Sequence, residues 1–86
     1  MNTWYLYIIQ TQKGKYYTGI TVDVDRRFLE HLSGINGAKF FRSDRPEHLV
    51  YVEDCKNRSD ASAREAFIKK LTRKQKEKLI SEVYNE

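Results

Sequence analysis

Length, composition and charge exclude several classes of protein at the outset. With 86 residues the chain has room for one small domain, residues 1–86, whose core is too small to enclose a large substrate. Its 16 Lys and Arg against 12 Asp and Glu give a net charge of +4, which favours a polyanionic partner without proving one. The single cysteine, Cys55, excludes an internal disulfide, and no apolar run approaches the roughly 20 residues of a membrane span, so we expect a cytoplasmic protein without membrane contact.

Two runs of β-forming residues open the chain, Trp4–Gln10 and Lys15–Ile20, on either side of a short polar loop that ends at Gly14. This spacing predicts a hairpin closed by a three-residue loop, with the glycine in the left-handed conformation. In that register Tyr7 and Tyr17 lie on the same face of the sheet. Both faces of the first strand are apolar or aromatic, which is typical of a central strand covered on both sides.

An amphipathic helix is predicted next, from an N-cap at Asp23 to a stop at Gly34. Its buried stripe is predicted at four-residue intervals, at Val24, Phe28 and Leu32. Arg27 and His31 lie four residues apart at the edge of this stripe. Two phenols, one guanidinium and one imidazole are therefore expected to converge on one spot.

An irregular crossing is predicted over residues 35–47, where basic residues alternate with two phenylalanines: Lys39, Phe40, Phe41 and Arg42. Such a segment can contact nucleic acid through phosphates and stacked bases. The alternative, that the two phenylalanines pin a long loop to the core, is the one that we favour from the sequence.

The third strand is predicted over His48–Cys55, which is rich in β-branched and aromatic residues. A helix capped by Ser59 and running to Lys70 follows, with an apolar side made of Ala63, Phe67 and Leu71. Thr72 and Gln75 form a capping box that starts a last helix, with an apolar face of Leu79, Ile80, Val83 and Tyr84. The order β-β-α-β-α-α predicts an α+β fold, a three-stranded antiparallel sheet flanked by helices.

The junction between the last two helices is strongly basic. Six of its residues carry a positive charge: Lys69, Lys70, Arg73, Lys74, Lys76 and Lys78. The pattern fits a solvated helix face and a phosphate-binding surface equally well.

Two tyrosine triplets, Tyr5-Leu6-Tyr7 and Tyr17-Thr18-Gly19, are followed by Arg27 eight residues after the glycine and by His31 four residues later. This ordered set resembles the GIY-YIG nuclease domain, and the resemblance covers nearly the whole chain. The arrangement is also similar to a subgroup of short bacterial members that consist of this domain alone, the UPF0213 type.

The resemblance implies a role for each of these side chains. Arg27 would contact the scissile phosphate, and Tyr17 or Tyr7 would orient or deprotonate the attacking water, a role for which His31 competes. Gly19 would be structural, allowing a close approach of backbone or substrate.

Glu65 stands where the family places its metal-binding glutamate, which implies one divalent cation, Mg²⁺ or Mn²⁺. From the residues alone, Glu65 is an ordinary helical partner of Lys69, four positions on. The chain also departs from the family, because the first triplet lacks its glycine and no asparagine follows at the expected place, where Lys76, Glu77 and Lys78 stand.

The leading hypothesis is therefore a metal-dependent endonuclease acting on DNA in repair or processing. The alternative is a nucleic-acid-binding domain that does not cut, and a module that binds only a protein partner is the third. In the first two, six basic residues are the candidates for nucleic-acid contact: Lys39, Arg42, Lys69, Lys70, Arg73 and Lys74. Because no additional DNA-binding domain is present in this sequence, we expect specificity to be low or supplied by a partner protein.

Overall fold

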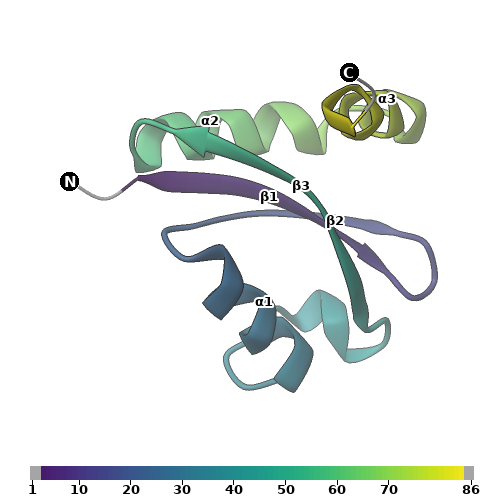
Figure 1. Cartoon of the computed structure of the whole chain (residues 1–86). Helices are drawn as coiled ribbons and strands as arrows, with labels where there is room; N and C mark the ends of the chain where they lie inside the picture. Colours follow the sequence, from purple (N-terminus) through teal and green to yellow (C-terminus); the bar gives the residue numbers. More distant parts are fainter. Residues whose placement is uncertain (1–2, 85–86) are drawn as a thin grey trace.

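The first strand, β1, is the centre of an antiparallel sheet with the order β2-β1-β3. The computed structural model describes residues 3–84 (Figure 1). Along the chain the elements are β1 (Trp4–Thr11), β2 (Tyr16–Thr21), α1 (Val24–Ser33), the 3-10 helix η1 (Lys39–Arg42), β3 (Pro46–Cys55), α2 (Arg58–Lys69) and α3 (Arg73–Tyr84). The predicted α+β fold and the order β-β-α-β-α-α are confirmed, with one short helix, η1, inside the segment predicted to be irregular.

The hairpin between β1 and β2 has the predicted register. Gly14 has a φ of 85°, and the Thr11 amide donates a hydrogen bond of 2.9 Å to the Lys15 carbonyl across the turn. Tyr7 pairs with Gly19, and two residues further along β1 the partner is Tyr17. Because side chains two apart on a strand point to the same face, both tyrosines lie on one face of the sheet.

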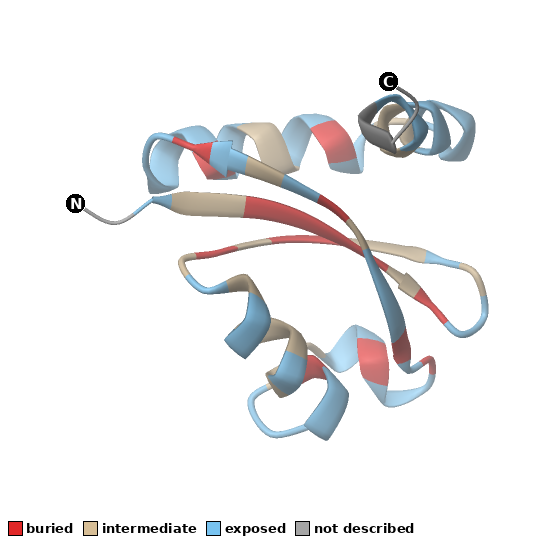
Figure 2. Cartoon of the chain, viewed as in Figure 1, coloured by how far each residue is buried: buried red, intermediate tan, exposed pale blue. Residues whose placement is uncertain are grey.

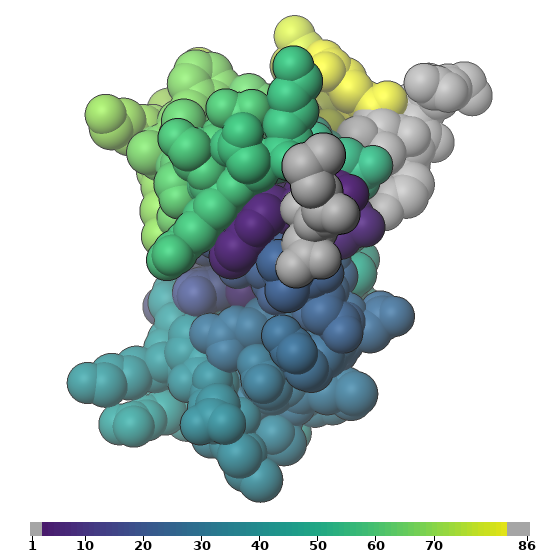
Figure 3. All heavy atoms as spheres, turned by 90° about the vertical axis from the view of Figure 1, so that its left-hand side faces the viewer, coloured from purple at the N-terminus to yellow at the C-terminus, as the bar shows by residue number. Residues whose placement is uncertain are grey.

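Two small cores lie on the two faces of β1. Leu6 and Ile8 face α2 and α3 and pack with residues such as Ile68, whereas Tyr7 and Ile9 face α1 and η1. Figure 2 shows the buried residues concentrated along β1 and on the helix sides that face the sheet. In the perpendicular view of Figure 3, β1 lies between the layer of α2 above and the layer of α1 below.

α1 has the predicted boundaries but a different buried stripe. Asp23 accepts a hydrogen bond of 3.0 Å from the Arg26 amide as N-cap, and the helix ends at Gly34 with a φ of 81°. The prediction that Leu32 is buried is wrong, and His31 takes its place. With 3.6 residues per turn, the position two turns after Val24 is residue 31, so a strict four-residue spacing drifts away from the sheet.

α2 corrects the sequence prediction at two points. Its N-cap is Asn57, whose side chain accepts a hydrogen bond of 2.8 Å from the Asp60 amide, and Ser59 lies inside the first turn. The buried positions are Ala61 and Ile68, again two turns apart, whereas the predicted Ala63 and Phe67 are exposed. The predicted Leu71, which follows the helix, does pack against the core.

The capping box that separates α2 from α3 is confirmed. The Thr72 amide donates to Oε1 of Gln75 at 2.9 Å, and the Gln75 amide donates to Oγ1 of Thr72 at 3.2 Å. Leu79 and Ile80 pack on the core of the sheet as predicted. The side chains of the other two predicted positions, Val83 and Tyr84, lie outside the described part of the chain.

β3 starts two residues earlier than predicted, at Pro46, which pairs with Thr11. Proline is tolerated here because it is the first residue of an edge strand, where its missing N–H is not needed. The strand ends at the buried Cys55, and burial raises the pKa of its thiol, as fits a structural residue. Within residues 3–84, no helix has the length and apolar character that crossing a membrane requires.

Candidate active site

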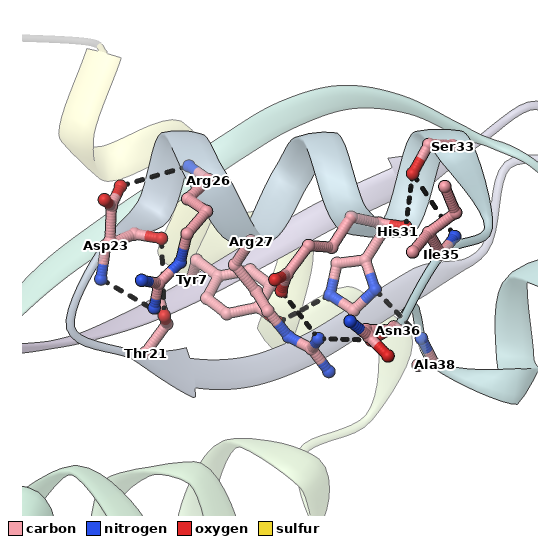
Figure 4. Close-up of polar contacts among 11 residues, drawn as sticks. Tyr7, Thr21, Asp23, Arg26, Arg27, His31, Ser33, Ile35, Asn36 and Ala38 are labelled. Carbon is pink, nitrogen blue, oxygen red and sulfur yellow. Dashed lines mark hydrogen bonds and ion pairs between the residues drawn. The ribbon is translucent and has the colours of Figure 1, made fainter.

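A hydrogen bond of 2.8 Å joins the Tyr7 hydroxyl to Nε2 of His31, between β1 and α1 (Figure 4). Both side chains are 2% exposed. On the other side of the imidazole, the Ala38 amide donates to Nδ1 at 3.1 Å. An amide can only donate, so Nδ1 carries no proton and the neutral ring has its proton on Nε2. His31 therefore donates to the Tyr7 oxygen and does not accept from it.

The charge state of His31 agrees with this hydrogen-bond pattern. Burial, and then the positive charge of Arg27, lower the pKa of His31 to about 4. The imidazole is therefore neutral at pH 7, and both of its nitrogens are engaged by the protein. A neutral ring with both nitrogens engaged in this way orients the Tyr7 hydroxyl.

The ring of Tyr7 lies across β2 because residue 19 has no side chain. A Cβ at Gly19 would come within 2.5 Å of the Tyr7 hydroxyl oxygen, so only glycine fits beneath this ring. Burial, and then the neighbouring Tyr17, raise the pKa of Tyr7 well above 10, and Arg27 offsets only part of the shift. Tyr7 is therefore a protonated phenol at neutral pH.

Arg27 extends from α1 toward the same hydroxyl group. Its Nη1 donates to Oε1 of Glu30 at 3.0 Å and to the carbonyl oxygen of Asn36 at 2.7 Å (Figure 4). Burial alone would lower the pKa of Arg27, but its contacts with Glu30 and Tyr7 raise it, so the guanidinium stays charged. Both of these hydrogen bonds use Nη1, and a guanidinium has five N–H donors, so donors remain for an anionic ligand.

Tyr17 belongs to a cluster of five rings that covers this face of the sheet. The members of this aromatic cluster are Tyr7, Tyr17, His31, Phe40 and Phe41. The Tyr17 ring centroid lies 4.8 Å from that of Phe41 and 5.3 Å from that of His31. In the described part of the chain the Tyr17 hydroxyl has no hydrogen-bond partner, so it can bind a ligand or water.

Glu65 approaches from the other layer. It lies on α2, which packs on the opposite face of the sheet from Tyr7, and Oε2 of Glu65 is 3.4 Å from Nζ of Lys69. The negative charge of Glu65 nevertheless contributes to the raised pKa of Tyr7, so the carboxylate is within electrostatic range of that hydroxyl. Because β2 is an edge strand and α2 packs against it, a site that included Glu65 would have to span this edge, with the four other predicted residues on the α1 face.

The donor set at this edge fits a hard divalent cation that keeps most of its water. Among residues 3–84, no group of three or more His, Cys, Asp or Glu side chains is arranged to hold a metal ion. Mg²⁺ is commonly held by one or two carboxylates, with water and substrate phosphate as the remaining ligands. Glu65 is partly exposed and, among the described residues, is paired only through one long contact with Lys69, so one carboxylate is available.

The six basic candidates fall into two groups. Lys69 and Arg73 are engaged, because Lys69 contacts Glu65 and Arg73 lies 4.7 Å over the ring of Tyr16 and pairs with Glu77. The other four are exposed and form no ion pair within residues 3–84: Lys39, Arg42, Lys70 and Lys74. Lys39 and Arg42 flank the aromatic cluster in η1, whereas the lysines lie at the α2–α3 junction.

Three residues that hold the site together were not predicted from the sequence. Asn36, whose carbonyl binds Arg27, has a φ of 58°, a conformation that asparagine tolerates better than most residues. Asp44 is buried and accepts hydrogen bonds from Oγ1 of Thr11 at 2.6 Å and from the Lys13 amide at 3.0 Å, which ties the η1 segment to the hairpin turn. The contact of Glu30 with Arg27 could have been predicted, because residues three apart on a helix are neighbours. Nothing in the sequence near Asp44 indicates its contacts with Thr11 and Lys13.

The chain matches the GIY-YIG catalytic domain over residues 3–78. It belongs to the GIY-YIG family. The UPF0213 protein DP2720 of Desulfotalea psychrophila is 48% identical over 77 residues, covering 90% of this chain and 70% of that protein. The UPF0213 protein YhbQ of Escherichia coli K12 is 45% identical over 82 residues, covering 95% and 81% of the two chains.

Two solution structures have the same fold. The UPF0213 protein BH0048 from Bacillus halodurans is 40% identical, with a TM-score of 0.59 over 92% of this chain and 83% of that one. The protein EF2693 from E. faecalis is 38% identical, with a TM-score of 0.68 over 100% of this chain and 91% of that one. This chain is therefore a short GIY-YIG protein of the UPF0213 type, and the predicted family is confirmed.

Proposed function

We propose that this GIY-YIG protein is a divalent-metal-dependent endonuclease that hydrolyses phosphodiester bonds of DNA. The proposal depends on one observation: the charged Arg27 guanidinium lies beside the Tyr7 hydroxyl, which His31 holds in place at the edge of β2. Hydrolysis needs a cation on the phosphoryl oxygens, an oriented water and help for the leaving oxygen. Each requirement has a candidate side chain at this edge.

Arg27 is the candidate for binding the scissile phosphate. A guanidinium presents several N–H donors in one plane, which matches two phosphoryl oxygens, and it stays charged at neutral pH. Glu30 and the Asn36 carbonyl hold Nη1 alone, so they orient the fork and leave its other donors for the substrate.

The two tyrosines are assigned different roles. Since His31 donates to the Tyr7 oxygen and the Tyr7 phenol is protonated, Tyr7 donates its own hydrogen to a phosphoryl oxygen or to the attacking water. Tyr17, whose hydroxyl has no protein partner within residues 3–84, orients the water. The water oxygen bonds to phosphorus as the bond to the leaving oxygen breaks. The attacking water gives its proton to bulk solvent, and the leaving oxygen takes one proton from bulk solvent, so atoms and charge balance.

Glu65 would hold Mg²⁺ or Mn²⁺, since its carboxylate is partly exposed and its charge is felt at Tyr7. A bound ion would stabilise the charge that develops on the phosphoryl and leaving oxygens. Lys69 pairs with this carboxylate at 3.4 Å, and the exposed lysine could turn to solvent or to the DNA backbone to make room for the ion.

The test is cleavage of single-stranded, nicked and branched DNA in Mg²⁺ or Mn²⁺ by the purified chain and its variants. We expect Glu65→Gln to abolish metal-dependent cleavage while keeping DNA binding, and Arg27→Lys to slow cleavage about 10²- to 10³-fold, the cost of one lost transition-state donor. Glu82→Gln, an exposed carboxylate on α3, is the matched control and should cut like the wild type.

Two outcomes would contradict the proposal. Cleavage that is untouched by both Glu65→Gln and Arg27→Lys would come from a contaminating nuclease. Salt-sensitive binding that survives Glu65→Gln, without cleavage in either metal, would assign the protein to the non-cutting, nucleic-acid-binding alternative.

A further inference from the structure

Phe40 is an exposed aromatic ring that the catalytic proposal does not use. It is 40% exposed, although it lies on η1 directly beside the buried Phe41. The sequence favoured the interpretation that both phenylalanines pin the loop to the core. The structure separates them, because only Phe41 is buried and Phe40 keeps part of its ring open to solvent.

The ring of Phe40 is continuous with the candidate active site. Its centroid lies 5.4 Å from that of Tyr17 and 5.5 Å from that of Phe41, nearly perpendicular to the latter at 83°. Phe41 in turn lies 4.7 Å from the ring of His31. A ligand group that stacks on Phe40 would therefore sit one ring away from Tyr17, the side chain assigned to the attacking water.

The segment that carries Phe40 is fixed at several points. Its N-terminal end is held by the hydrogen bond from the Ala38 amide to His31, and its C-terminal end by the buried Asp44. Although burial opposes it, the hydrogen bonds from Thr11 and Lys13 keep the pKa of Asp44 below its usual value, so this anchor stays ionised at neutral pH. The exposed ring is therefore presented in one place, which lowers the entropy cost of binding to it.

The charge around Phe40 suits a polyanion. Lys39 and Arg42 stand on either side, both exposed and without an ion-pair partner in the described residues. Asp44, a carboxylate two residues after Arg42, is buried and occupied by two hydrogen-bond donors, so it repels little. An aromatic face flanked by cations is the arrangement by which proteins bind single-stranded nucleic acid, with bases on the ring and phosphates on the cations.

From this we propose that Phe40 is a stacking platform for the base of an unpaired nucleotide beside the scissile phosphate. The protein would then prefer DNA with single-stranded nucleotides at the cleavage point. In a continuous duplex the bases are already stacked inside, and reaching the platform would require a base to be unpaired and flipped out of the duplex, which is unfavourable. The proposal rests on the nuclease function for its location, but the stacking itself can be tested without cleavage.

The test measures binding of a labelled single strand and of a duplex of the same sequence, in EDTA, so that no cutting occurs. Phe40→Ala and Phe40→Leu should weaken single-strand binding about 5- to 140-fold, the range that corresponds to the 1–3 kcal/mol of one stacked base, and leave duplex binding within about twofold. Phe40→Trp should bind the single strand like the wild type. Phe67→Ala removes an exposed phenylalanine from the opposite layer and is the matched control.

A fluorescent adenine analogue placed along the single strand gives a second readout. Its emission should be quenched at one position in the wild type and not in Phe40→Leu, because leucine keeps the apolar contact and loses the aromatic face. Single-strand binding by Phe40→Leu at wild-type strength, or an equal loss of duplex binding in Phe40→Ala, would overturn the stacking proposal.

The two proposals fail separately. Cleavage that depends on Glu65 but not on Phe40 would leave the nuclease standing without the platform. Conversely, Phe40-dependent binding of single strands by a protein that cuts no DNA would leave the platform on a non-catalytic domain. If the ring instead contacts a protein partner, neither DNA affinity nor quenching will respond to its substitution, and that result contradicts the proposal.

Discussion

Three neighbouring residues determine the position and the protonation state of the Tyr7 hydroxyl. The missing side chain of Gly19 gives the ring its place, the Nε2–H of His31 fills one lone pair of the oxygen, and Arg27 lies close enough to lower the pKa in part. The net effect of burial is still to keep the phenol protonated. Any catalytic role of Tyr7 must therefore begin from the neutral phenol, and this argues for a hydrogen-bond donor more than for a ready-made base.

The lowered pKa of His31 predicts a specific dependence of stability on pH. The folded state binds a proton at His31 only near pH 4, whereas the unfolded chain binds it near pH 6.5, so the unfolded state holds more protons between these values. The stabilisation contributed by neutral His31 should therefore be fully present above about pH 6.5. Between pH 7 and pH 5, the free energy of unfolding should fall by about 2 kcal/mol from this group alone. Chemical denaturation at several pH values measures it.

The exposed His48 supplies the control for this measurement. Relative to the wild type, His31→Gln should lose this part of the pH dependence, and His48→Gln should keep it. A steep pH dependence that persists in His31→Gln would show that the proton is taken up elsewhere, and the hydrogen-bond assignment at Tyr7 would then be wrong.

Helix boundaries illustrate what acts at the scale of the element. α1 and α3 begin where local signals place them, at Asp23 and at the Thr72–Gln75 capping box. α2 begins two residues before the expected position, because Asn57 takes the cap in place of Ser59. Both side chains can cap a helix, so local chemistry does not choose between them.

Substituting the two candidate caps of α2 tests that assignment. Asn57→Ala removes the acceptor for the Asp60 amide and should lower the free energy of unfolding by about 1 kcal/mol, within the usual range for a lost N-cap. Ser59→Ala, inside the first turn, should change stability by less than about 0.5 kcal/mol. Thermal unfolding of the two variants compares them directly, and a larger loss in Ser59→Ala would restore the assignment made from the sequence.

Over the whole molecule, the charge is distributed unevenly about the layers. The α2–α3 junction carries the exposed Lys70 and Lys74, and Arg73 beside them covers the ring of Tyr16 at the start of β2. The following residue of β2, Tyr17, points to the active-site face. A single strand of DNA that stacks on Phe40 and passes Arg27 can therefore continue around the edge of β2 toward Lys70 and Lys74.

Salt titration of DNA binding tests whether the junction is part of the interface. If each lysine neutralises one phosphate, Lys70→Gln with Lys74→Gln should reduce the slope of log K against log salt by about 1.4 on single strands. Lys56→Gln, an exposed lysine in the β3–α2 connection at the other end of the sheet (Figure 1), should leave the slope unchanged. An unchanged slope in the double variant would mean that the junction is a solvated helix face.

Much of the fold was readable from the sequence. The hairpin register follows from Gly14 and the alternation of aromatic residues, and the central position of β1 follows from apolar side chains on both of its faces. The tyrosines were correctly placed on one face for the same reason. These signals act between residues that are close in sequence, where hydrogen bonds and side-chain periodicity have few alternatives.

Only the tertiary structure decided the remaining features. His31 is buried and Leu32 is not, and Ala61 faces the sheet in place of Ala63. Both outcomes depend on which turn of each helix contacts β1 or β2. The neutral state of His31, with a hydrogen bond at each ring nitrogen, requires the Ala38 amide and the burial supplied by the surrounding layers. Burial and electrostatic effects are sums over groups that are distant in sequence, whereas the sequence by itself fixes the local geometry of each element.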